Sequence, residues 1–321
     1  MNHANPHEIP VFFSIDDNYA PFLAVALRSA IDHASPDNRY RAIILHQGLT
    51  AENMHKLSAL ATEHFHIDFV PMETSMACIT DRMSNRLRCD YFTLTIYFRL
   101  FIPAMFPQYD KGIYIDSDVV VMDDLANLFA VDIGDNYIGA CADESVSDVP
   151  PLALYMEEGI GTSRYQYINS GVLLMNLKLL REKRLDEHFL HLLSTYHFDC
   201  IAPDQDYLNA ICKGRIHLLP SRWDLMPNER KPAASDMGII HYNLFSKPWC
   251  YDNIQYEEYF WHYAKDSGYH DELVAYKANY SEEQKASDAQ CMGLLAQRGE
   301  MIARSEINFK KMHESGVKIR L

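Results

Sequence analysis

Short apolar runs and amphipathic stretches alternate through the first seventy residues, and this alternation is what most limits the folds open to the chain. Residues 11–15 form an apolar run that ends in polar residues, and residues 41–46 and 67–70 are two further strand-like segments. Between them, apolar residues at helical spacing predict helices over residues 21–33 and 50–61, the second capped by Thr50. Strand, helix, strand, helix, strand is typical of a parallel sheet with right-handed crossovers.

The later part of the chain continues this pattern and then changes character. The expected helices cover residues 94–104, 177–196 and 205–211, and the expected strands cover 112–115, 137–141, 168–175, 216–219 and 238–240. Beyond residue 250 the chain is aromatic and charged, and we expect it to be helical to about Arg304. The sequence therefore predicts an α/β domain over residues 1–250, followed by a mainly helical region over residues 251–321.

Composition excludes several classes of protein. The 321 residues include 48% hydrophobic residues, enough for a sizeable core, and carry a net charge of −15, which disfavours nucleic-acid binding. Seven scattered cysteines without a CxxC pair argue against a disulfide framework or a thiolate zinc site. The first ten residues are polar, unlike a signal peptide, and no apolar run is long enough to span a bilayer. We expect a cytoplasmic protein with at most peripheral membrane contact.

A pair of carboxylates, Asp116 and Asp118, directly follows the apolar segment 113–115. Ligands of open parallel sheets bind at the carboxyl ends of strands. Two carboxylates there can hold a hard cation, which would bridge two phosphate groups. Because D-x-D also occurs by chance, simple strand-end aspartates are the plainer alternative. A haloacid-dehalogenase-like phosphatase is another, with Asp116 as nucleophile, although three predicted strands precede the motif here and that superfamily usually has it on the first strand.

Five more segments, spaced along the chain, accompany this motif. They are FSIDDNY at residues 13–19, YFRL at 97–100, INSGVLLMN at 168–176, PDQD at 203–206 and, as the last, HYNLFSKPW at 241–249. In this order they resemble glycosyltransferase family 8 over about residues 10–250, a family that includes bacterial lipopolysaccharide galactosyl- and glucosyltransferases and glycogenin. The resemblance implies a GT-A fold, a UDP-sugar donor, Mn²⁺ or Mg²⁺ as cofactor, and retention of the anomeric configuration.

The resemblance also implies which residues bind the metal and the nucleotide. Asp116, Asp118 and His241 would be the protein ligands of the ion, a set that suits Mn²⁺ better than Ca²⁺ because it includes an imidazole. Asp118 would also lie near the ribose. The uridine would be bound by three residues of the first motif, Asp16, Asn18 and Tyr19.

A further group of polar residues would surround the donor sugar and diphosphate. These are Arg99, Asp143, Asn169, Asp204, Gln205 and Lys247. Gln205 would lie nearest the anomeric carbon, and because an amide is a poor nucleophile we expect a front-face reaction in which Lys247 and Arg99 stabilise charge. Asp206 is the carboxylate that a double displacement would use.

One position departs from the family pattern, which is usually H-x-x-G-x-x-K-P-W. Leu244 stands in place of the glycine, so we expect a shifted loop or the loss of one backbone contact with phosphate. The donor is expected to be UDP-glucose or UDP-galactose, and the acceptor a glycan such as lipopolysaccharide. A protein that binds the UDP-sugar without transferring it is a third hypothesis, although the polar positions of the motifs are intact.

Overall fold

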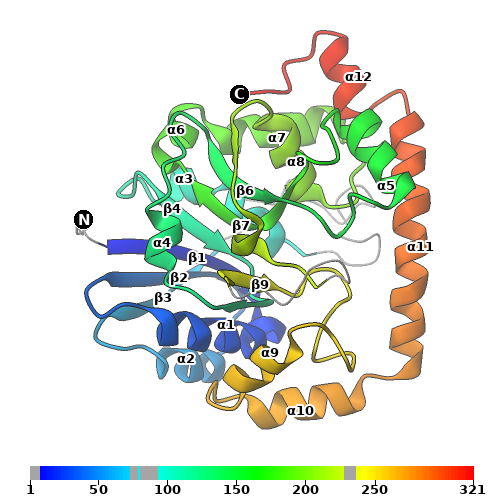
Figure 1. Ribbon diagram of the computed structural model, residues 1–321. Helices are drawn as coiled ribbons and strands as arrows, with labels where there is room; N and C mark the ends of the chain where they lie inside the picture. Colours follow the sequence, from blue (N-terminus) through cyan, green and yellow to red (C-terminus); the bar gives the residue numbers. More distant parts are fainter. Residues whose placement is uncertain (1–7, 73–78, 80–92, 228–235) are drawn as a thin grey trace.

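The computed structural model describes residues 8–72, 79, 93–227 and 236–321. Within these residues, a seven-stranded sheet in the order β3-β2-β1-β4-β7-β6-β8 forms the centre (Figure 1). Its first half is parallel and consists of β3 (Phe65–Pro71), β2 (Arg39–Gln47), β1 (Glu8–Asp16) and β4 (Gly112–Ile115). The strands and crossovers predicted for the first seventy residues are thus confirmed.

The second half of the sheet is mixed. It contains β7 (Ile168–Met175), β6 (Ile138–Ala142) and β8 (Ile216–Leu218). β7 runs antiparallel to both β4 and β6, whereas β6 and β8 are parallel. Because of this reversal, the beginning of β7 lies at the same edge of the sheet as the end of β4, which brings residues from both strands to one place. A separate antiparallel pair, β5 (Val119–Val121) and β9 (Ile239–His241), lies beside this edge.

Helices cover both faces of the sheet (Figure 1). One face packs against α1 (Ala20–His33), α2 (Ala51–Ser58) and α9 (Glu257–Ala264). The other packs against α3 (Ile102–Met105), α6 (Leu177–Glu182), α7 (Leu185–Tyr196) and α8 (Pro203–Ile211). α4 (Leu125–Phe129) follows β5. Side chains along β1 alternate between the two apolar layers, since Val11 and Phe13 belong to one and Phe12 to the other.

Two predicted helices differ in the structure. Residues 94–104 form the 3-10 helix η3 (Thr95–Leu100) followed by the short α3, where Pro103 stands in the first turn and has no N–H to continue the α-helical bonding from η3. The predicted helix over 177–196 is divided into α6 and α7, because Arg184 has a left-handed backbone with φ 55°.

The region after residue 250 is helical, as predicted, but continues past Arg304. It contains α9, α10 (His270–Asn279), the long α11 (Glu282–Arg304) and α12 (Phe309–Glu314). α11 runs along one side of the molecule from α10 to the neighbourhood of α12 (Figure 1). There it contacts α5 (Pro150–Leu154) and the π-helix η4 (Tyr155–Ile160), two elements that the sequence did not predict. The C-terminal region therefore packs against both ends of the α/β core.

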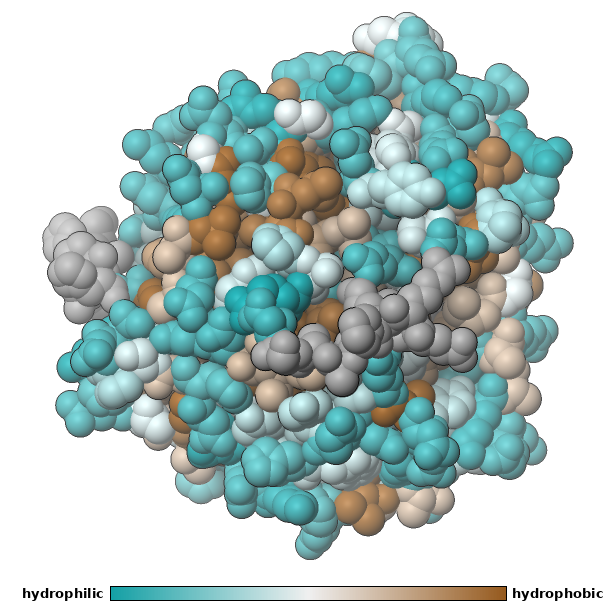
Figure 2. Space-filling view, in the orientation of Figure 1, coloured by the Kyte–Doolittle hydropathy of each residue, from teal (hydrophilic) through white to brown (hydrophobic). Residues whose placement is uncertain are grey.

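The surface seen in Figure 2 is hydrophilic over most of its area, with apolar residues gathered in its upper left part. Large apolar side chains lie mainly in the two layers beside the sheet. Among the described residues, no helix combines the length and apolar character needed to cross a bilayer.

Candidate active site

The site lies where four chain segments meet at one edge of the sheet. β1 and β4 end there at Asp16 and Asp116, and the antiparallel β7 enters there, so that the Asp116 N–H donates to the carbonyl of Gly171 at 2.7 Å. The β5–β9 pair places Val119 opposite His241, and the Tyr242 N–H donates to the carbonyl of Asp118 at 2.9 Å. Strand register thus explains how residues far apart in the sequence come together.

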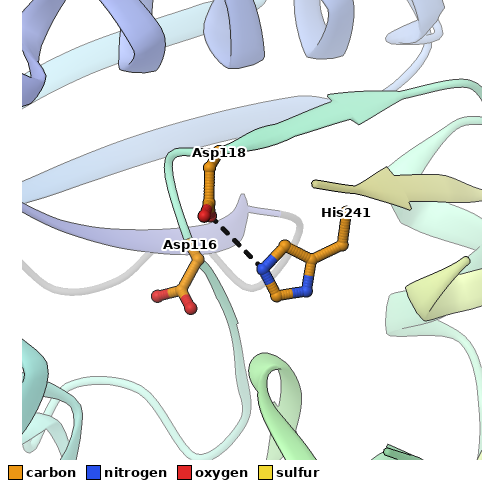
Figure 3. Close-up of side chains that lie close together, drawn as sticks. All are labelled: Asp116, Asp118 and His241. Atoms are coloured by element: carbon orange, nitrogen blue, oxygen red, sulfur yellow. Dashed lines mark ion pairs between the residues drawn. The ribbon is translucent and has the colours of Figure 1, made fainter. Parts of the chain in front are cut away.

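Asp116, Asp118 and His241 converge as the sequence predicted. Each can offer one ligand atom, and these atoms lie within 4.8 Å of one another. Figure 3 shows Asp118 and His241 pointing toward each other, with His241 Nε2 at 3.3 Å from Asp118 Oδ1 and Asp116 beside them. Two carboxylates and one imidazole are a donor set that fits Mn²⁺, and also Mg²⁺ to the extent that oxygen ligands dominate.

Gly171 makes room for this arrangement. A Cβ at this position would lie 2.3 Å from His241 Cε1 and 2.9 Å from Asp116 Oδ2. The imidazole therefore rests directly on the backbone of β7, and a side chain at position 171 would occupy the space of the cluster.

Asp116 is held by neighbours that approach only one of its oxygens. Its Oδ1 accepts hydrogen bonds from the Arg99 guanidinium and from the Tyr114 hydroxyl, each at 2.8 Å. Arg99 is almost fully buried and also pairs with Asp204 at 3.2 Å and donates to the Ser170 carbonyl at 2.6 Å. Within the described residues these hydrogen bonds of Asp116 end on Oδ1, which leaves Oδ2 available to a cation.

Charge on the other side of the cluster comes from Lys247 and His241. The Lys247 ammonium contacts Asp118 Oδ2 and the carbonyl of Tyr242. Burial alone would raise the pKa of Asp118, but the positive charges of Lys247 and His241 lower it well below its usual value. Burial lowers the pKa of His241, whereas Asp118 and Asp224 raise it, to about 10 in balance. Because a metal ligand must be a neutral imidazole, cation binding here would release a proton.

The residues predicted to surround the donor sugar form one hydrogen-bonded network. Asp143 Oδ2 accepts from the side-chain amides of Asn169 and Gln205, each at 3.0 Å. The Gln205 carbonyl oxygen accepts from the Ser170 N–H at 3.0 Å, and the Asp204 carboxylate accepts from the Ser170 hydroxyl at 2.9 Å. Both ends of the Gln205 amide are therefore fixed, and its orientation is determined before a ligand binds.

One cavity contains nearly all the residues that the sequence singled out. Its lining includes Asp16, Tyr19, Arg99, Asp116, Asp118, Asp143, Asn169, Asp204, Gln205, His241 and Lys247. Two predicted residues are not part of it. Asn18 is exposed, and its N–H donates to Asp16 Oδ1 at 3.0 Å.

Asp206, the second of these, faces the protein interior. Its carboxylate is fully buried and accepts hydrogen bonds from the hydroxyls of Tyr155 and Tyr167, at 2.7 and 2.6 Å. The backbone N–H groups of Ile201 and Ala202 donate to it at 3.1 and 3.0 Å. Burial raises the pKa of Asp206 to about 6, although these donors act in the opposite direction. The carboxylate anchors the N-terminal turn of α8, where Gln205 lies.

Leu244 has the backbone conformation that favours glycine. Its φ is 50°, in the left-handed region, and its side chain lines the cavity. Position 244 therefore has a glycine-type backbone although it carries a side chain, and the shifted loop or lost phosphate contact stays a prediction.

Three residues that contribute to the site have no predicted role in the sequence. Tyr114 lies in a predicted strand, Gly171 lies in the motif at residues 168–176, and Asp224 belongs to no motif. The signal for Gly171 was a residue without a side chain in an otherwise bulky strand. Asp224 lies 2.8 Å from His241, but only the fold shows it.

The amino-acid sequence matches the model of glycosyl transferase family 8 over residues 10–253. The chain belongs to this family. It is 31% identical over 221 residues to a putative glycosyltransferase of Haemophilus influenzae, an alignment that covers 68% of this chain and 64% of that protein. It is 27% identical over 254 residues to a lipopolysaccharide 1,2-glucosyltransferase of Escherichia coli, covering 74% and 72% of the two chains.

Solved structures of two glycosyltransferases share the fold. The galactosyltransferase LgtC, in complex with donor and acceptor sugar analogues, has a TM-score of 0.68 and 28% identity over 80% of this chain and 96% of that one. The bifunctional glycosyltransferase WbbM has a TM-score of 0.73 and 23% identity, and the likeness covers 87% of this chain but 53% of that one. The family 8 chain therefore has the GT-A glycosyltransferase fold, with a mostly parallel central sheet flanked by helices and a helical C-terminal region.

Proposed function

We propose that this family 8 protein transfers glucose or galactose from a UDP-sugar to a hydroxyl group of a glycan acceptor, with retention of configuration. A divalent ion, Mn²⁺ or Mg²⁺, would assist. The observation that carries the proposal is the convergence of Asp116, Asp118 and His241 in the cavity that contains the other polar family residues. The names of the relatives, a lipopolysaccharide glucosyltransferase and a galactosyltransferase, support a hexose and a glycan acceptor.

The three proposed ligand residues fit the ion because Gly171 leaves space beside them and the hydrogen bonds from Arg99 and Tyr114 occupy only the Oδ1 atom of Asp116. When bound, the ion would neutralise the charge that develops on the diphosphate as it leaves. Lys247 would add a second positive charge at the same place, since its ammonium already contacts Asp118. Arg99 would act through Asp116 and Asp204, the two carboxylates that it binds.

Other residues of the cavity would bind and orient the donor. Asp16, at the end of β1, would bind the uridine together with Asn18 and Tyr19 in the adjoining 3-10 turn. The hexose hydroxyls would donate hydrogen bonds to the carboxylates of Asp143 and Asp204. The Asn169 amide could donate to them or accept from them. These buried polar groups are already hydrogen-bonded to one another, which reduces the cost of organising the site around a sugar.

The front-face route is supported by the environment of the two residues beside the anomeric carbon. Gln205 faces the cavity with its amide fixed at both ends, and an amide is a poor nucleophile. Asp206 has its carboxylate turned toward four interior hydrogen-bond donors, so it has no path to the sugar without breaking them. In the proposed reaction the leaving phosphate accepts the proton of the acceptor hydroxyl.

The acceptor would contact the apolar part of the cavity lining. This part consists of Val146, Leu152, Met156, Ile201 and Leu295, which belong to one apolar cluster or pack against it. Leu295 belongs to α11, so residues 251–321 would contribute directly to acceptor binding. Apolar surface next to Gln205 fits the hydrophobic face of a sugar ring or an apolar group attached to it.

The test is release of UDP from UDP-glucose and from UDP-galactose, measured with and without Mn²⁺. We expect one donor to be turned over in the presence of the ion, and the Asp118→Asn variant to lose this activity while Asp132→Asn, an exposed turn residue, keeps it. Binding of UDP and Mn²⁺ without any release or transfer would instead indicate a non-catalytic binder. Membership of family 8 replaces the phosphatase hypothesis, and release of inorganic phosphate from a phosphoester would contradict our assignment of Asp116.

A further inference from the structure

Asp224 is a buried carboxylate that the donor and metal roles described above do not use. It is the last residue of the 3-10 helix η5 (Ser221–Asp224), and its side chain is fully buried. Its Oδ1 atom lies 2.8 Å from His241 Nδ1, on the side of the imidazole opposite Asp118. Its Oδ2 atom is buried without a hydrogen-bond partner among the described residues. An unpaired buried carboxylate oxygen is costly, which indicates a role beyond packing.

The backbone around this contact is fixed on both sides. The Leu225 N–H donates to the carbonyl of Ile239 at 2.8 Å, and the His241 N–H donates to the carbonyl of Leu225 at 2.9 Å. Arg222, in the same turn as Asp224, pairs with Asp123 at 2.9 Å. These backbone hydrogen bonds fix the segments of Asp224 and His241 relative to each other, so the fold itself brings the two side chains into contact.

The imidazole of His241 has three contacts that together leave it one orientation. Asp224 lies at Nδ1, Asp118 lies at Nε2, and the backbone of Gly171 lies under Cε1. A neutral imidazole carries a proton on one nitrogen and a lone pair on the other. A carboxylate accepting from Nδ1 keeps the proton there and leaves the Nε2 lone pair for a cation.

We propose that Asp224 is a positioning residue that fixes the Nδ1–H form of His241 and directs Nε2 toward the divalent ion. This inference rests on the proposed function, because it requires that His241 is a metal ligand. The accepting oxygen is what matters in this role, so an asparagine at position 224 can still serve, whereas alanine cannot.

The test is the affinity of the whole chain for Mn²⁺ in the presence of UDP. Binding is measured as the decrease in the electron paramagnetic resonance signal of free Mn²⁺. Asp224→Ala should weaken Mn²⁺ binding roughly ten- to a hundredfold. Asp224→Asn should remain within about threefold of the wild type, since its carbonyl oxygen can accept the same bond. Asp123→Ala is the matched control, because it removes the Asp123 partner of Arg222 in the same turn without touching His241. It should bind Mn²⁺ as the wild type does.

A second measurement does not depend on the folding of any variant. Two-bond ¹H–¹⁵N correlation spectra of the wild type with Mg²⁺ and UDP should show His241 protonated at Nδ1. An Nε2-protonated ring, unchanged Mn²⁺ affinity in Asp224→Ala, or an equal loss in Asp224→Asn and Asp224→Ala would overturn the role of Asp224. Failure of the wild type itself to bind Mn²⁺ with UDP would refute the proposed function instead.

Discussion

Replacing Gly171 with alanine tests whether the space over β7 is what allows the three ligand residues to converge. The added methyl group would lie 2.3 Å from His241 Cε1, whereas ordinary van der Waals contacts begin at 3.4 Å, so the ring must move by more than 1 Å. The backbone of β7 cannot easily give way, because β7 is paired with strands on both sides. The displacement therefore falls on His241.

The magnitude follows from that displacement. Introducing a methyl group into a packed interior costs about 1–3 kcal/mol of the free energy of unfolding, which a domain of this size should survive. A ligand moved by 1 Å no longer reaches an ion held by Asp116 and Asp118, and a displacement of that size can lower kcat/KM by roughly a hundredfold. We expect the functional loss to be much larger than the loss of stability.

The assay combines UDP release at saturating Mn²⁺ with thermal unfolding of the same preparations. Gly112→Ala is the matched control. Gly112 lies on β4, the strand next to β7, away from the proposed ligand residues, and a Cβ there would lie 2.8 Å from a ring carbon of Phe12. It should lose comparable stability and keep its Mn²⁺ dependence. Wild-type activity and metal affinity in Gly171→Ala would refute the reasoning.

Three further outcomes follow from the cavity and its buried carboxylate. Gln205→Ala should slow transfer roughly tenfold or more while leaving UDP-sugar affinity nearly unchanged, and an effect confined to donor affinity would contradict the role given to the amide. Because the folded-state pKa of Asp206 is raised to about 6, its carboxyl ionises at a lower pH in the unfolded chain than in the folded one. The stability of the wild type relative to Asp206→Asn should therefore fall by roughly 2 kcal/mol between pH 4 and pH 7 in chemical denaturation, and a rise would contradict this. Leu295→Gln should raise the acceptor KM by roughly tenfold without changing UDP-sugar hydrolysis, whereas Leu294→Gln, whose side chain is 43% exposed, should change neither.

The parallel half of the sheet could be predicted because its strands are short apolar runs separated by segments with apolar residues at helical spacing. The apolar run at residues 168–175 located β7 correctly. Its antiparallel direction could not be predicted, since pairing direction depends on partners distant in the sequence. The division between α6 and α7 was missed because Arg184 takes a left-handed conformation that its residue type does not favour. The π-helix at 155–160 has no sequence signature distinct from an α-helix.

Individual ligand residues could be named from motif order, and the structure brings Asp116, Asp118 and His241 together as expected. Orientation could not be predicted in this way. Asp206 stands next to Gln205 in the sequence, yet successive residues of a helix point in different directions, and it is buried on the opposite side. Asp224 depends on the contact between η5 and β9, which no local pattern encodes.

Tyr155 joins the C-terminal helix to the centre of the cavity. A Cβ at Gly299 of α11 would lie 3.2 Å from the Tyr155 Cβ and 3.1 Å from Leu152 Cδ2, while the Tyr155 hydroxyl binds Asp206 beside Gln205. A larger residue on this face of α11 would thus displace Tyr155, whose hydroxyl donates to Asp206 in the first turn of α8. As relatives diverge, positions 152, 155 and 299 should change together, and the C-terminal segment should not be exchangeable between family members unless these partners are inherited with it.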